Sequence, residues 1–309
     1  MKRLLAVLLL IVNPLQAEGY PWSNAAPAEI AAASLHPDQV LDEEPCNWRP
    51  VLSPIVCPMV QHCTSAREAT LHIAANLGRI TGVYYTPQRR KHNMNALEAL
   101  AEKKVSCTGQ SILLICALRS VDIPARAVGV LCWNHIRGNH TWAEAWFDGA
   151  WHMIEFNEQS FNTPWVMENI GMLDSRIPWQ RIKAATPAGK SRWYLPEQPR
   201  VPAIPAEDVT TRYMELARQH YAKSGMSADY QHLLVDLQPR SSTPPMVELL
   251  NDKQEIVSSL RLPALSDDMR YFTRMQLPRT GQHYLRIEGR RNIIPISATA
   301  EPVQIVRLR

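Results

Sequence analysis

The chain has 309 residues, of which 46% are hydrophobic, so it can bury a full core and is most simply divided into two domains. Its formal net charge of +4 is modest and spread along the chain, which argues against nucleic acid as the principal partner. No glycine-rich phosphate loop is present, and no motif predicts a cofactor.

The N-terminal residues have the three parts of a secretory signal peptide. A basic start is followed by an apolar run over residues 4–12 and by small residues that end at Ala17. The apolar run is too short to span a bilayer comfortably, and no other segment approaches the needed length. We therefore expect residues 1–17 to be a signal peptide and the mature protein to be exported, to the periplasm or the medium, with no transmembrane anchor.

Residues 24–35 and 66–81 are predicted to be helical, and the proline-containing stretch between them is predicted to be rich in loops. In an oxidising compartment we expect one disulfide within this stretch, whose pairing stays open among Cys46, Cys57 and Cys63. A zinc site is the competing interpretation, but the stretch has no Cys-x-x-Cys pair and only His62 beside it. Two further cysteines lie in apolar segments and are predicted to be buried: Cys116 and Cys132.

A short basic run over residues 88–92 precedes a third predicted helix over residues 96–104. Most such runs are solvated surface, and a groove lip that favours acidic substrates is the minority interpretation.

Cys107 precedes an apolar run over residues 111–119 that contains no Gly or Pro and is too long for an ordinary strand. The run predicts a buried helix that ends near Asp122. Ser106 is a suitable N-cap for it, and the helix dipole then favours a negative sulfur in the first turn. A thiol attacks a carbonyl only as the thiolate and needs such an electropositive setting, so Cys107 is the candidate nucleophile.

Asp148-Gly149 lies between two runs of aromatic and β-branched residues, which is the strongest short-range hairpin signal. Strands are predicted over residues 140–147 and 150–157. With a two-residue turn, His140 and Glu155 become diagonal neighbours on one face, about 7–8 Å apart at the backbone. Glu155 can then accept a hydrogen bond from one imidazole nitrogen while the other takes the cysteine proton. Asn157, directly opposite His140, is the alternative orienting residue.

An oxyanion hole needs hydrogen-bond donors, and the backbone N–H of Cys107 at the helix start is a natural one. A second donor is expected from an indole or amide side chain, without discrimination among Trp133, Asn139 and Gln110. Glu144 shares the His140 face of the strand and is expected to be a structural acceptor.

These motifs together resemble the transglutaminase-like core superfamily of papain-like cysteine enzymes, over roughly residues 68–160. Members carry a cysteine at a helix start, a His-x-Trp-x-Glu strand and an aspartate on the next strand, and here the match is Cys107, residues 140–144 and Glu155. The resemblance implies an α+β papain/transglutaminase-like fold, in which a nucleophile helix packs on an antiparallel sheet. It also implies that Cys107 is the nucleophile and His140 the general base. Glutamate replaces the family's aspartate.

The catalytic domain, with an N-terminal helical and loop extension, is expected over residues 18–205. Residues 160–205 have little periodicity and are predicted to wrap the core as ordered loop. Residues 206–230 are predicted to be a linker or a helix. About seven short alternating runs follow over residues 231–309 and predict a small immunoglobulin-like β-sandwich.

The predicted function is thiol-dependent acyl transfer at a peptide or carboxamide carbonyl, through a thioester on Cys107, with hydrolysis preferred because water is at about 55 M. Amine transfer that cross-links proteins and a catalytically inactive binding scaffold are the alternatives. The expected partner is a protein or peptide substrate. Contact with a cell surface or a glycan through the C-terminal domain is a further possible interaction.

Overall fold

The computed structural model describes residues 19–133, 138–193, 204–223, 229–237, 242–262, 274–300 and 303–308. The expected signal peptide, residues 1–17, lies outside them. Within these ranges, no helix combines the length and apolar character needed to cross a membrane.

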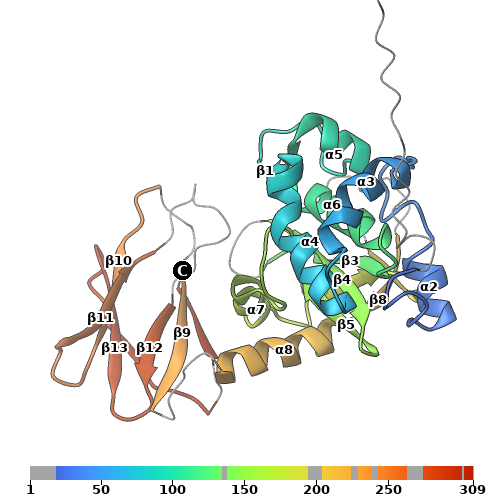
Figure 1. Ribbon diagram of the computed structural model, residues 1–309. Coiled ribbons are helices and arrows are strands. Elements are labelled where there is room, and N and C mark those ends of the chain that lie inside the picture. Colours follow the sequence, from blue (N-terminus) through green and yellow to red (C-terminus); the bar gives the residue numbers. More distant parts are fainter. Residues whose placement is uncertain are drawn as a thin grey trace, which may run out of the picture.

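A six-stranded sheet forms the centre of the first region, with the order β5-β4-β3-β6-β8-β7 (Figure 1). Every neighbouring pair in it is antiparallel. The strands are β3 (Ala125–Val130), β4 (His140–Phe147), β5 (Ala150–Ile154), β6 (Ile182–Ala185), β7 (Ser191–Trp193) and β8 (Ile204–Asp208). Strands β3 and β4 are buried almost throughout, because helices cover both faces of the sheet.

One face of the sheet packs against a helical layer centred on α6 (Cys107–Arg119), which lies on β3 and β4 (Figure 1). The other helices of this layer are α2 (Ala28–Ser34), α3 (Arg49–Val60), α4 (Ala66–Thr81) and α5 (Ala96–Glu102). A two-stranded parallel ladder, β1 (Tyr84–Tyr85) with β2 (Lys104–Val105), leads into α6. Residues 111–119 are all buried, which explains why the sequence between Ser111 and Arg119 is apolar on every side. The predicted fold class, a nucleophile helix on an antiparallel sheet, is confirmed.

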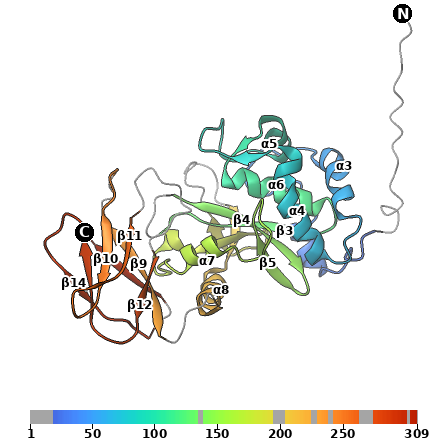
Figure 2. The same cartoon turned by 60° about the vertical axis from the view of Figure 1, so that its left-hand side comes forward.

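The opposite face packs against α7 (Pro164–Ile170) and α8 (Thr210–Lys223) (Figure 2). The prediction that residues 160–205 are loop is wrong, since α7, β6, β7 and a 3-10 turn over Pro178–Gln180 lie within them. The strands there have only three or four residues, too few for an alternating pattern to show. The boundary expected at residue 205 is also wrong, because β8 spans it and α8 packs on the first region.

Helix α3 occupies the stretch that was expected to be rich in loops. Its three prolines are spaced four residues apart on the exposed side, and the first of them, Pro50, lies in the first turn, where no N–H is needed. Leu52, Val56 and Val60 are buried on the other side, so amphipathic burial outweighs the cost of prolines inside the helix.

The disulfide expected within residues 46–63 is not present, since all six cysteines are thiols. Cys57 is buried in α3, and its sulfur accepts a hydrogen bond from the Tyr20 hydroxyl at 3.1 Å. Cys116 is buried as predicted, whereas Cys132 is exposed, contrary to the prediction.

The C-terminal region is all-β, and each of the predicted runs overlaps one strand. Two sheets, β11-β10-β13-β14 and β12-β9-β15, enclose one apolar core (Figure 2). The strands are β9 (Tyr230–Leu237), β10 (Met246–Leu250), β11 (Ile256–Arg261), β12 (Arg274–Pro278), β13 (His283–Ile287), β14 (Ile294–Ile296) and β15 (Val303–Leu308). Strand β15 pairs in parallel with β9. The immunoglobulin-like assignment stays a prediction.

Candidate active site

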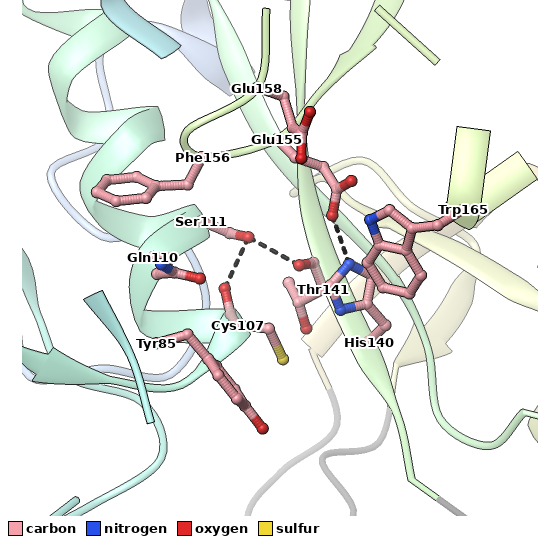
Figure 3. Close-up of a pocket in the computed structure, with 10 residues that line it drawn as sticks. All are labelled: Tyr85, Cys107, Gln110, Ser111, His140, Thr141, Glu155, Phe156, Glu158 and Trp165. Atoms are coloured by element: carbon pink, nitrogen blue, oxygen red, sulfur yellow. Dashed lines mark hydrogen bonds and ion pairs between the residues drawn. The ribbon is translucent and has the colours of Figure 1, made fainter. Parts of the chain in front are cut away.

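Cys107 is the first residue of α6, as the sequence predicts. The side chain of Ser106, the N-cap, accepts a hydrogen bond from the N–H of Gly109 at 2.9 Å. The Ser111 hydroxyl donates to the carbonyl of Thr141 at 2.9 Å, and the hydroxyls of Thr108 and Thr141 lie 3.0 Å apart. These contacts fix the first turn of α6 against the start of β4, so the thiol of Cys107 lies beside β4 (Figure 3).

The hairpin has the predicted turn and register. Asp148 and Gly149 both have positive φ, as a tight two-residue turn requires, and Phe147 pairs with Ala150. The structure brings His140 and Glu155 into contact, with His140 Nε2 2.6 Å from Glu155 Oε1. Both side chains are nearly buried. The glutamate therefore reaches the imidazole despite its extra methylene.

Asn157 does not lie opposite His140, so its predicted orienting position is wrong. Strand β5 ends at Ile154, and the chain then turns, with Asn157 at a φ of 67°. The Asn157 N–H donates to the carbonyl of Ala74 at 2.9 Å, and its side chain packs over Gly78 of α4. Asn157 thus ties the end of the hairpin to α4.

The charges of Cys107 and His140 are coupled. Burial alone lowers the pKa of His140, but the hydrogen bond with Glu155 and the charges of Glu155 and Cys107 raise this pKa to about 9. Burial alone raises the pKa of Cys107, but the charge of nearby His140 and the backbone N–H of Thr141 bring it below the ordinary value. The arrangement therefore shifts the balance of Cys107 and His140 toward a thiolate beside an imidazolium.

Three tryptophans surround the imidazole of His140. Ring centroids lie 4.6 Å from it for Trp165, 5.8 Å for Trp142 and 6.2 Å for Trp133. Sequence reasoning missed Trp165, which begins α7 after Pro164 and lies outside every motif. The sequence shows only that a tryptophan follows Glu155 by ten residues. That spacing does not indicate that its ring packs against His140.

Cys107, His140 and Glu155 line a narrow cavity of about 40 Å³ between α6, β4 and the chain after β5 (Figure 3). The lining residues are Tyr85, Cys107, Gln110, Ser111, His140, Thr141, Glu155, Phe156, Glu158 and Trp165.

Of the three expected oxyanion donors, Gln110 is the one that lines this cavity. Trp133 is buried against His140, and its indole N–H has no hydrogen-bond partner in the described part of the chain. Asn139 is half-buried just before β4 and does not line the cavity.

The basic run at residues 88–92 is largely neutralised by α5. Arg90 contacts Glu98 at 2.9 Å and Glu102 at 2.6 Å, and Lys91 contacts Glu98 at 2.7 Å. These ion pairs argue against the basic groove lip for acidic substrates.

Among the residues that the structure describes, no group of three His, Cys, Asp or Glu side chains is arranged to hold a metal ion.

Comparison with known proteins agrees with this arrangement. Residues 55–156 match the sequence model of the transglutaminase-like superfamily, which confirms the resemblance, and this range includes Cys107, His140 and Glu155. No curated protein matches.

Two solved structures are similar. A candidate cysteine protease from Cytophaga hutchinsonii is 16% identical, with 47% of this chain and 48% of that chain covered and a TM-score of 0.38. Red sea bream transglutaminase is 12% identical, with 79% of this chain and 57% of that chain covered and a TM-score of 0.34. The match therefore spans about half the length of each solved protein.

Proposed function

We propose that the transglutaminase-like core catalyses thiol-dependent acyl transfer at a peptide or carboxamide carbonyl, with hydrolysis as the outcome. The observation that carries this proposal is the position of His140, which faces Cys107 and has its Nε2 2.6 Å from Glu155 (Figure 3). That contact leaves the other imidazole nitrogen, Nδ1, for proton exchange at the sulfur.

In the first step, the Cys107 thiolate forms a bond to the carbonyl carbon. The backbone N–H of Cys107 and the Gln110 amide hold the developing oxyanion. The C–N bond then breaks as the His140 imidazolium gives its proton to the leaving nitrogen, which leaves a thioester. His140, now neutral, takes a proton from an attacking water, and the collapse of that adduct releases the acid and restores the thiolate and the imidazolium.

Glu155 holds one tautomer of His140 and stabilises its charge throughout. The replacement of the family's aspartate by glutamate is the feature of the sequence that favours an inactive scaffold. The 2.6 Å contact weakens that argument, because the carboxylate still reaches the imidazole. Transfer to an amine requires a site that holds the amine at high effective molarity, so hydrolysis is the simpler outcome.

The test is incubation of the purified protein with a mixed peptide library, with and without an added primary amine, followed by mass spectrometry. Hydrolysed peptides, together with a peptide thioester on Cys107 after acid quenching, would support the proposal. Amine adducts in place of acids would favour cross-linking, and no turnover of any peptide or carboxamide would favour a binding scaffold.

Glu155→Ala is expected to lower kcat by roughly 10²- to 10⁴-fold, less than the loss of the nucleophile, because an orienting carboxylate is less essential. Glu155→Gln keeps an acceptor oxygen without the charge, so its kcat should lie between those of the wild type and Glu155→Ala. Steady-state kinetics of the three proteins would check this order. A wild-type kcat in Glu155→Ala would remove Glu155 from the mechanism.

The alkaline limit of activity is also expected from the imidazolium. Because the pKa of His140 is raised to about 9, the proton for the leaving nitrogen is present below that pH and lost above it.

We further propose that the protein acts outside the cytoplasm. The signal-peptide pattern of residues 1–17 supports this proposal, and N-terminal sequencing of the protein from fractionated cells would test it. A role of the C-terminal β region in contacting a cell surface or a glycan stays a prediction.

A further inference from the structure

The region that matches the family model ends at residue 156. Helix α8 comes later in the chain and contacts β4 through Tyr213. Trp142, two residues after His140 on the same face of β4, is fully buried. Its indole N–H donates to the hydroxyl of Tyr213 at 2.7 Å, and that hydroxyl donates to Glu144 Oε1 at 2.7 Å. Tyr213 is itself fully buried, so neither hydrogen bond can be replaced by bulk water.

We propose that Tyr213 is a positioning residue for His140 and that it acts through Trp142. The proposal rests on the proposed function, in which His140 must carry a proton beside Cys107. The Trp142 ring lies 5.8 Å from the imidazole and is inclined to it by 31°. The Tyr213 ring meets Trp142 edge-on, with centroids 5.2 Å apart.

A fixed indole beside a protonated imidazole stabilises the cation, since the electron-rich face of the ring attracts positive charge. A hydrogen bond from the indole N–H polarises the ring in the same sense. Removing the Tyr213 hydroxyl leaves the buried N–H without its acceptor and frees the ring to turn. The imidazolium then loses part of its support, and the thiolate that it stabilises is lost with it.

Titratable groups from several elements surround His140. Cys107 from α6 and Glu155 after β5 face the imidazole directly. Beyond Trp142, the described groups are Tyr213, Glu144 and Arg212, and the last two form an ion pair. Burial and the charge of Glu144 raise the pKa of Tyr213 well above its ordinary value, so its hydroxyl stays protonated over the working pH range. Tyr213→Phe therefore changes no charge near the site.

The experiment compares Tyr213→Phe with Tyr221→Phe, a matched control on the same helix. Tyr221 is also buried and donates its hydroxyl to the carbonyl of Glu168 at 2.9 Å. Tyr213→Phe loses the hydrogen bonds to Trp142 and Glu144, and Tyr221→Phe loses the hydrogen bond to Glu168, so both variants are expected to lose stability, Tyr213→Phe more. The pH midpoint of Cys107 alkylation should rise by roughly half to one unit in Tyr213→Phe only, with kcat lowered roughly 3- to 10-fold and KM unchanged.

An unchanged midpoint in Tyr213→Phe, or equal shifts in both variants, would overturn the inference. A wild-type protein without a low-pH thiolate would instead refute the proposed function, so the two failures are distinguishable. If Tyr213→Phe does not fold, Trp142→Phe removes the donor of the same hydrogen bond. The pH midpoint of Cys107 alkylation must then rise in Trp142→Phe as well.

Discussion

Replacing Cys107 with alanine is expected to abolish turnover, lowering kcat by roughly 10⁴- to 10⁶-fold, while the thermal midpoint changes by no more than about 3 °C. In the proposed mechanism the Cys107 sulfur forms the thioester, and the side chains beside it in the cavity cannot replace it as the nucleophile. Cys107 is the first residue of α6, and the later residues of the helix make its buried contacts with the core. The substitution is therefore expected to have a small effect on stability.

Steady-state kinetics and calorimetry of the variant check this expectation. The matched control is Cys132→Ala, the same substitution at an exposed thiol that does not line the cavity. Its kcat should be that of the wild type. Equal activity in Cys107→Ala and the wild type would refute the thiol mechanism.

Glu144→Ala is expected to cause the largest loss of stability, about 3–5 kcal/mol in the free energy of unfolding. Glu144 is fully buried and contacts Arg126 at 2.9 Å, Arg212 and the Tyr213 hydroxyl. Arg126 is itself buried, so losing the carboxylate leaves a buried guanidinium without its main partner. Urea unfolding followed by circular dichroism would measure the change.

Glu207→Ala provides the control, because Glu207 also pairs with Arg126 at 2.9 Å but is 56% exposed. It should cost less than about 1 kcal/mol. Similar losses in the two variants would show that the burial of Glu144 does not determine its contribution. If Glu144→Ala does not fold, Glu144→Gln keeps the shape and should lose a smaller amount.

The position of Cys107 at a helix start and the pairing of His140 with Glu155 were predictable because each depends on local sequence, whereas the approach of Cys107 to His140 was expected from the family resemblance. Ser106 caps the helix that begins at Cys107, and Asp148-Gly149 fixes the register that brings His140 near Glu155. Asn157 does not face His140, because strand β5 ends at Ile154 and the hairpin pairing does not continue to residue 157. The expected structural role of Glu144 agrees with its buried ion pairs.

The surroundings of the site could not be predicted in the same way. Trp165 and Tyr213 reach His140 and Trp142 from helices that come later in the chain, and tertiary packing alone decides which side chains meet. Helix α3 contains prolines that predict a loop, but the apolar period that buries Leu52 and Val56 determines its structure. The disulfide was inferred from compartment and spacing, and neither fixes the distance between thiols.

The most direct test of the central claim is iodoacetamide labelling of the native protein from pH 4 to 9, followed by peptide mass analysis. Burial raises the pKa of the Cys46 and Cys63 thiols, so their peptides serve as internal controls that resist labelling. If His140 holds Cys107 as a thiolate, labelling of Cys107 should persist below about pH 7. Labelling that appears only near pH 8.5, or none at any pH, would contradict an activated nucleophile at this site.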